Sequence, residues 1–319
     1  MKIPAFAFWP VLLFLAALCP AQTATEKSSP TERVDPGKGF DYPYYLYVPP
    51  ALREPESAGK TFSVLVIPNN TGTGISDDLN DHEQDVKRKM VQAAFVFNQL
   101  NAAVLVPVFP RPKTDWKIYT HALDRDSLTT GKKEYKRFDL QLKAMIDDAR
   151  SRLQDDKIKT DEKVLMYGFS ASGMFVNRFT FLHPERVRAA AIGSPGGWPI
   201  APVATFEKKN LRYPVGVADL KEVAGEELNL KELRKVPLFV FMGDKDDNDS
   251  LTYRDGYEEE DEKLVFELFG KTPVERWEMS RKLYQDQKLN ATFKLYEGVA
   301  HTMSKEMRED ILKFLTGHL

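Results

Sequence analysis

Short apolar runs alternate along the chain with longer segments in which apolar residues recur at helical spacing. The runs are rich in β-branched and aromatic residues, which predicts buried strands. The longer segments carry apolar side chains three or four positions apart, which predicts amphipathic helices. The predicted strands are residues 40–48, 62–67, 102–108, 163–167, 187–192, 238–242 and 291–296. The predicted helices are residues 81–100, 133–153, 171–182, 273–287 and 304–315.

This alternation of elements predicts an α/β fold. Strands that are apolar throughout are buried on both faces, so helices should flank a mostly parallel sheet on both sides. We expect one domain over residues 40–319, because no linker rich in glycine, proline or serine divides it. Residues 198–235, between two predicted strands, are long enough to form a small cap. Ligands bind such sheets beyond the carboxyl ends of the strands, so residues that follow a strand are the functional candidates.

The amino-terminal region has the features of an export signal. Lys2 supplies the positive start, residues 11–18 the apolar run and residues 19–21 a cleavage site, so residues 1–21 are predicted to be a signal peptide. The polar residues 22–39 are expected to form a flexible leader. We therefore predict a secreted or periplasmic protein without stable membrane insertion, because the apolar run is short for a membrane span. An uncleaved anchor is the alternative.

Composition excludes several classes of function. The chain has 45 basic and 47 acidic residues and a net charge of -2, so it has no electrostatic attraction to nucleic acid, and we predict no such partner. The acidic residues 258–262 are expected to be a solvated surface segment without function. Cys19 is the single cysteine and lies in the predicted signal, which excludes cysteine nucleophiles, thiolate metal sites and disulfides from the mature chain.

One predicted strand runs through a short turn directly into a predicted helix, and Ser170 occupies that turn. A serine held in this way exposes its hydroxyl above the sheet, and small residues on either side let the helix approach the strand, which is typical of a nucleophile. Gly168 meets this requirement, whereas Ser172 stands where a second glycine is usual and Gly173 follows it. The alternative interpretation is that Ser170 or Ser172 caps the helix.

A nucleophilic serine requires a histidine as general base. His301 follows the last predicted strand, at the edge of the sheet where the serine lies. The chain order of nucleophile, acid and histidine also agrees with a triad on a parallel α/β sheet. His121 is the reserve candidate and a candidate for lining the pocket. The histidines set aside, at predicted helix ends or near the carboxyl terminus, are His82, His183 and His318.

The acid that orients His301 should follow the preceding strand. That strand leads into Gly243 and a run of carboxylates, in which the common spacing from the glycine selects Asp246. Its carboxylate would accept the other N–H of the imidazole and stabilise the imidazolium. Asp244 and Asp247 are the alternatives for this role. A solvated acidic loop or a weak calcium site is the other interpretation, although the run lacks the glycine and distal glutamate of a calcium loop.

The negative charge that develops on an acyl oxygen requires N–H donors. The Ala171 amide, at the start of the helix behind the serine, is the first predicted donor. The second should come from the glycine-containing loop of residues 68–74, in which Asn70 and Thr71 are the candidates. A plain turn is the alternative interpretation of this loop.

Together these motifs resemble the α/β-hydrolase superfamily. Residues 45–50 before the core, the turn around Ser170, the segment 243–246 and the segment 298–301 are similar to those of secreted esterases such as feruloyl esterases and polyhydroxybutyrate depolymerases. The resemblance spans residues 40–315. It departs from those esterases where Asn69 and Asn70 replace the usual His-Gly of the oxyanion loop, and where a serine replaces the glycine noted above.

The resemblance implies hydrolysis of a small-molecule or polymeric carboxylic ester through an acyl-enzyme, without a cofactor or metal. A serine peptidase on the same fold and a catalytically inactive binding protein are the alternatives. Candidates for substrate binding are the aromatic residues of the predicted cap and of the loop after the third predicted strand: Trp198, Trp116 and His121, with Phe206 and Tyr213.

Overall fold

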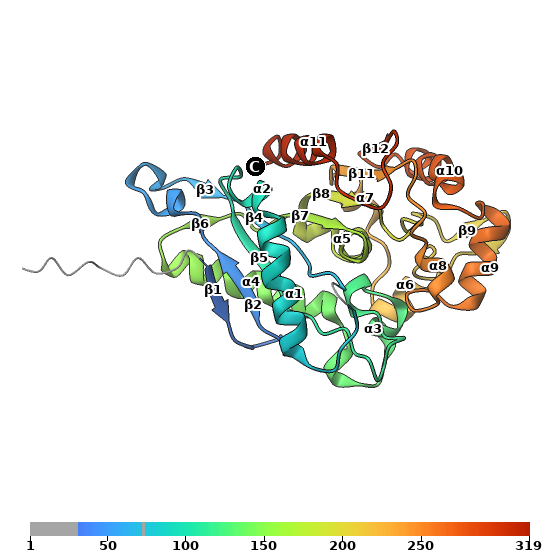
Figure 1. Cartoon of the computed structure of the whole chain (residues 1–319), viewed down its shortest axis with the longest axis horizontal. Coiled ribbons are helices and arrows are strands. Elements are labelled where there is room, and N and C mark those ends of the chain that lie inside the picture. The colour runs from blue at the N-terminus through green and yellow to red at the C-terminus, as the bar shows by residue number, and fades with distance from the viewer. Residues whose placement is uncertain (1–30, 72–73) are drawn as a thin grey trace, which may run out of the picture.

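The apolar runs of the chain assemble into one eight-stranded sheet (Figure 1). The computed structural model describes residues 31–71 and 74–319, with the strand order β1-β2-β5-β4-β7-β8-β11-β12. The strands from β5 to β12 are parallel to one another, and β1 and β2 add an antiparallel edge. The strands are β1 (Thr31–Val34), β2 (Tyr44–Tyr47), β4 (Val64–Val66), β5 (Ala103–Pro107), β7 (Val164–Phe169), β8 (Val187–Gly193), β11 (Leu238–Gly243) and β12 (Ala291–Tyr296).

Shorter strand pairs and the helices complete the described chain. The pairs are β3 (Thr61–Phe62) with β6 (Lys159–Thr160), and β9 (Thr205–Phe206) with β10 (Lys209–Asn210). The helices are α1 (Leu79–Gln92), α2 (Ala94–Phe97), α3 (Arg125–Thr129), α4 (Phe138–Asp155), α5 (Ala171–Leu182), α6 (Leu220–Ala224), α7 (Leu230–Leu233), α8 (Ser250–Tyr253), α9 (Glu259–Leu268), α10 (Pro273–Asp286) and α11 (Lys305–Thr316).

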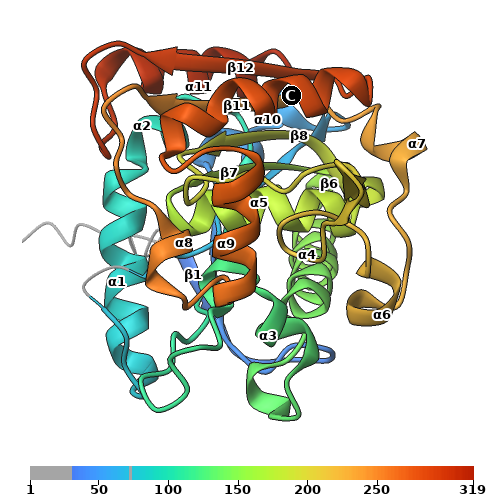
Figure 2. The same cartoon turned by 90° about the vertical axis from the view of Figure 1, so that its right-hand side faces the viewer.

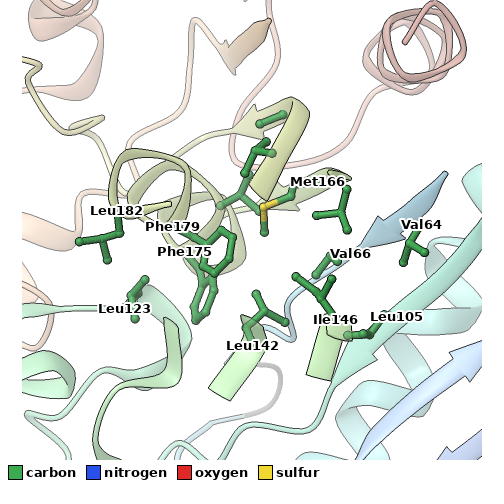
Figure 3. Packing of buried hydrophobic residues seen from close by; sticks show 14 of the residues in the cluster. Val64, Val66, Leu105, Leu123, Leu142, Ile146, Met166, Phe175, Phe179 and Leu182 are labelled. Carbon is green, nitrogen blue, oxygen red and sulfur yellow. The ribbon is translucent and has the colours of Figure 1, made fainter. Parts of the chain in front are cut away.

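Helices cover both faces of the sheet, as the apolar strands predict. Apolar side chains of α4, α5 and α10 pack on one face, and those of α1, α2 and α11 pack on the other. Figure 3 shows Ile146 of α4 and Phe175 of α5 packed toward the strand residues Val66 and Met166. Each fully buried side chain of this kind stabilises the fold by about 1.5–3 kcal/mol relative to leaving it exposed.

Four sequence predictions about elements differ from the structure or lie outside it. The predicted signal peptide, residues 1–21, and the leader as far as residue 30 lie outside the described residues. The end of the predicted leader forms β1, which pairs with β2. The predicted helix 81–100 is two helices, α1 and α2, separated at Ala93. The acidic segment 258–262 forms the first turn of α9, where carboxylates favour the positive end of the helix dipole and Asp261 is buried.

A buried ionic cluster joins α4 to the end of α5. Asp139 is fully buried and accepts two hydrogen bonds from Arg137, at 2.9 and 2.8 Å, and one from His183 Nε2 at 2.9 Å. Burial raises the pKa of the Asp139 carboxyl, but these partners lower it more, to about 2. Burial lowers the pKa of His183, but the hydrogen bonds with Asp139 and Glu185 and the charge of Asp139 together outweigh it, so that pKa lies above 6.5.

Replacing Asp139 with asparagine is expected to lower the free energy of unfolding by about 3 kcal/mol, because it leaves buried charge unpaired. A carboxyl whose pKa falls on folding stabilises the protein above its ordinary pKa of 3.8, and that contribution is lost as pH falls toward about 2. A histidine whose pKa rises on folding stabilises below 6.5, and its contribution is lost at higher pH. The difference between wild type and Asp139→Asn should therefore be largest at about pH 4–6.

Urea denaturation between about pH 3 and pH 8 measures this difference. Asp147→Asn is the matched control, because Asp147 pairs with Arg186 at an exposed position and should cost less than about 1 kcal/mol. An equal loss at every pH would contradict the ionic role of Asp139.

Candidate active site

Ser170 lies in the sharp turn that joins β7 to α5. Its backbone has φ 63° and ψ -130°, a sparsely populated conformation for a residue other than glycine. The Ser170 hydroxyl makes no capping hydrogen bond to α5, although Ser170 is the residue before the helix. Its backbone amide donates to Gly193 O of β8 at 3.0 Å, which ties the turn to the neighbouring strand. The hydroxyl is therefore free to serve another partner.

The glycines around this turn permit close approach of the backbone. A Cβ atom on Gly168 would lie 2.2 Å from Ser172 O, and one on Gly173 would lie 2.3 Å from Gly193 O. The second close contact thus falls on Gly173, one position later than in the usual pattern. Ser172 supports the turn instead, because its hydroxyl donates to Phe169 O at 2.9 Å and accepts from Phe169 N at 3.0 Å.

The structure brings Ser170, His301 and Asp246 together from the ends of three different strands. His301 Nε2 lies 3.0 Å from Ser170 Oγ, and His301 Nδ1 lies 3.0 and 2.9 Å from the two carboxylate oxygens of Asp246. The imidazole also lies against the Phe169 ring, with 5.0 Å between centroids. The hydroxyl, imidazole and carboxylate therefore form one connected chain.

The carboxylates that follow β11 have different surroundings. Asp246 is buried, and Asn248 N donates to its Oδ1 at 3.0 Å. Burial raises the pKa of Asp246, but the hydrogen bond with His301 leads the opposing effects, and the pKa lies below 3.8. Asp244 Oδ1 accepts from Gly298 N at 2.7 Å and so holds the loop that carries His301. Asp247 is exposed.

The turn before Asp246 packs directly on the loop before His301. A Cβ atom on Gly243 would lie 1.9 Å from Val299 O, so only glycine fits at this position. Lys245 N also donates to Val299 O, at 2.9 Å. These contacts fix the distance between the two loops and hence between the carboxylate and the imidazole.

Two asparagines anchor the loop after β4, one to the segment after β5 and the other to the serine turn. The buried Asn69 side chain donates to Phe109 O at 2.9 Å and accepts from Phe109 N at 3.1 Å. Asn70 Nδ2 donates to Phe169 O at 3.1 Å, next to Ser170, and Asn70 Oδ1 accepts from Thr71 N at 2.9 Å. The Thr71 backbone amide therefore already donates to a neighbouring side chain. The Asn70 backbone amide is left as the predicted second donor. The predicted first donor, the Ala171 backbone amide, lies in the first turn of α5, where an amide has no acceptor within the helix.

Two adjoining cavities, of about 540 and 450 Å³, share Ser170 and His301 in their walls. The other walls of the larger cavity come from α1, the loop after β4 and α8, and Figure 2 shows α1 and α8 on the same side of that view. The smaller cavity is lined by α1, α2, β7 and α11 with the segment before it. Polar and charged side chains dominate the larger cavity. The lining residues that sequence analysis did not identify include Asp85, Arg88, Lys89, Tyr119, Asn248 and Tyr253.

The sequence pattern distinguishes one of these residues, Lys89. Lys89 lies three positions after Val86 and four before Ala93, which are both buried. A lysine on the apolar stripe of a predicted helix is unusual, because a buried ammonium requires a partner. Asp85 and Arg88 lie on the same predicted helix as Lys89, whereas Tyr119, Asn248 and Tyr253 belong to loops or a short helix whose path no periodic pattern indicates.

The predicted substrate-binding residues do not line these cavities. Trp198 is 1% exposed, belongs to a buried apolar cluster and stacks on Phe269 with 4.3 Å between ring centroids. His121 is fully buried and donates from Nε2 to Phe109 O at 2.7 Å, and burial lowers its pKa to about 3. Trp116 is exposed outside the cavities.

The predicted cap, residues 198–235, contributes no residue to either cavity among the residues described. It packs against the body of the molecule instead. Tyr213 is buried, and its hydroxyl donates to Leu123 O. Phe206 packs beside Phe269, with 5.1 Å between ring centroids. The aromatic side chains Trp198, Phe206 and Tyr213 therefore pack in the body of the molecule and line neither cavity at Ser170.

Comparisons with known proteins identify the fold. Neither protein-family models nor curated protein sequences match this chain. Among solved structures, poly(aspartic acid) hydrolase-1 from Sphingomonas sp. KT-1 is 16% identical with a TM-score of 0.58, over 90% of this chain and 97% of that one. The chain has the α/β-hydrolase fold. A poly(3-hydroxybutyrate) depolymerase from Bordetella parapertussis is 18% identical, with a TM-score of 0.54 over 90% of both chains. The predicted resemblance to this superfamily is confirmed at the level of the fold.

Two further observations concern the described part of the chain. Its helices are all too short or too polar to cross a lipid bilayer. Its histidines and carboxylates form no group of three or more that could hold a metal ion. Asp244 and Asp246, which the calcium interpretation required, instead contact Gly298 N and His301.

Proposed function

We propose that this protein is a serine hydrolase that cleaves carboxylic esters through an acyl-enzyme. The observation that carries the proposal is the hydrogen-bonded chain from Ser170 Oγ through the His301 imidazole to the Asp246 carboxylate. An imidazole that contacts a serine with one nitrogen and a buried carboxylate with the other is the arrangement that activates a hydroxyl for acyl transfer. The fold shared with a named depolymerase and a named hydrolase is compatible with it.

In the proposed reaction, Ser170 Oγ attacks the ester carbonyl carbon while His301 Nε2 accepts the hydroxyl proton. The carbonyl oxygen becomes an oxyanion, which the Ala171 amide and the Asn70 amide would stabilise. His301 then donates the proton to the departing alcohol, and an acyl-enzyme remains. Water then attacks the acyl-enzyme while His301 accepts a proton from it. His301 returns that proton to Ser170 Oγ, and the acid is released. Asp246 keeps the imidazole oriented and stabilises its charged form.

The proposed substrate is a small-molecule or polymeric ester, and the proposed location is outside the cytoplasm, following the predicted signal at residues 1–21. The same arrangement could act on an amide. An assay with matched p-nitrophenyl esters and p-nitroanilides distinguishes an esterase from the serine peptidase alternative.

Incubation with a fluorophosphonate is expected to label Ser170 at about one equivalent, because only an activated serine attacks this reagent. Intact-mass measurement and peptide mapping give the extent and position of labelling. Ser170→Ala should take up no reagent, whereas Ser172→Ala should retain labelling, because the Ser172 hydroxyl is engaged by the Phe169 backbone. Absence of label on the folded wild-type protein would support the inactive binding protein instead.

A further inference from the structure

Lys89 of α1 occupies the wall shared by both cavities at Ser170 and His301. The two lysine-bearing positions on this turn of α1 differ in their surroundings. Lys87 is exposed and lies 3.7 Å from Glu83 Oε1. Lys89 is partly buried, and within residues 31–71 and 74–319 its ammonium has no ion pair or hydrogen bond. A side chain of this kind is held at a functional cavity without a protein counter-ion.

Other charges at the cavities do not neutralise Lys89. Arg88 is already paired with Asp85, the acidic side chain in the wall of the larger cavity. Arg308 lines the smaller cavity with its guanidinium 5.7 Å from the Phe95 ring centroid and adds a second positive charge. The site is therefore positive although the whole chain has a net charge of -2.

The absence of a counter-ion has a physical consequence. Burying an ammonium without a partner disfavours its charged form, and burial lowers the pKa of Lys89 to about 8. An anionic group bound beside it would restore the lost interaction and favour the charged lysine. Lys89 should therefore gain a stronger interaction with a bound anion than an exposed lysine does.

From this placement we propose that Lys89 binds a carboxylate carried by the substrate, so that the enzyme prefers esters of acids or alcohols that bear a negative charge close to the scissile bond. This inference rests on the proposed serine hydrolase function, because the cavity is the one in which Ser170 acts. It names the substrate class that the sequence-based resemblance leaves open.

Matched ester pairs test the preference on each side of the scissile bond. Mono-4-nitrophenyl adipate and 4-nitrophenyl hexanoate have acyl chains of equal length and differ in a terminal carboxylate. 4-Acetoxybenzoate and its methyl ester carry the same difference on the alcohol side. For each pair, the measured quantity is kcat/KM of the anionic ester divided by kcat/KM of the neutral ester. In the pair whose carboxylate reaches Lys89, Lys89→Met should lower this ratio by about 10- to 100-fold, the range for a hydrogen bond to a charged group. Lys87→Met is the matched control and should leave the ratio within about twofold.

A ratio that Lys89→Met leaves unchanged for both pairs would overturn the proposal while leaving the hydrolase function intact. Failure of the hydrolase function is separately recognisable, because then no ester is cleaved and Ser170 takes up no fluorophosphonate. In that event, calorimetric binding of adipate to the wild-type protein but not to Lys89→Met supports the anion site, and absence of binding overturns it.

The pH dependence of the ratio gives an independent readout. The titratable and charged side chains that face the two cavities with Lys89 are Asp85, Arg88, Tyr119, Tyr167, Tyr253, His301 and Arg308. His301 acts on both members of a pair, so its ionisation cancels in the ratio. The ratio should fall as pH rises through about 8, where Lys89 loses its charge, and should stay constant in Lys89→Arg, because arginine remains charged. A flat wild-type ratio would contradict the role of Lys89.

Discussion

Replacement of Ser170 with alanine is expected to lower kcat for an ester by about five to six orders of magnitude. The reason is geometric: His301 Nε2 lies 3.0 Å from Ser170 Oγ, and this hydroxyl is the proposed nucleophile. Only transition-state stabilisation by the amide donors would remain, which gives a small residual rate. Steady-state kinetics with 4-nitrophenyl butyrate measure the loss.

The same assay shows whether Ser170 and His301 act together or contribute to the rate independently. His301→Ala should cost about as much as Ser170→Ala, and the double variant should be no slower than either one, because both side chains serve one proton transfer. Ser172→Ala is the matched control on the same turn. Loss of its hydrogen bonds to the Phe169 backbone should cost about 1 kcal/mol of stability and less than about tenfold in rate. Full activity in Ser170→Ala would exclude the proposed nucleophile.

The fold could be predicted because the strands of the central sheet have a clear hydrophobic pattern in the sequence. Strands buried on both faces are continuous apolar runs, and α5 occupies the residues predicted for it, 171–182. Edge elements leave a weaker trace. The strand Thr31–Val34 is half exposed and polar, so its pairing with β2 depends on the neighbouring strand rather than on its own composition.

The site could be predicted in part because parallel strands deliver their carboxyl ends to one edge of the sheet. Ser170, Asp246 and His301 each follow such a strand, so the order of the strands brings them together. Trp198 was misassigned because an aromatic side chain has no local signal that distinguishes core packing from ligand contact. Lys89 is unusual on the apolar stripe of its helix, but only the three-dimensional path of α1 places it at the cavities beside Ser170.

Asp246→Asn is expected to lower kcat by about 10⁴-fold with little change in stability of the Ser170 turn. The buried carboxylate accepts from His301 Nδ1 with both oxygens, at 3.0 and 2.9 Å. An amide can donate as well as accept, so it permits the tautomer in which Nε2 carries the proton and cannot take one from the serine. The hydrogen bond with His301 helps to hold the pKa of Asp246 below 3.8, so the wild-type carboxylate stays ionised at neutral pH.

The neighbouring carboxylates provide the controls that decide which residue is the acid. Asp247 is exposed, so Asp247→Asn should change kcat by less than about twofold. Asp244 holds the histidine loop through Gly298 N, so Asp244→Asn should weaken that anchor and cost an intermediate amount, about tenfold, without altering the pH profile. A larger loss in Asp244→Asn or Asp247→Asn than in Asp246→Asn would transfer the orienting role to that residue. The geometry opposes this outcome, because Asp246 is the carboxylate of the run that contacts the imidazole.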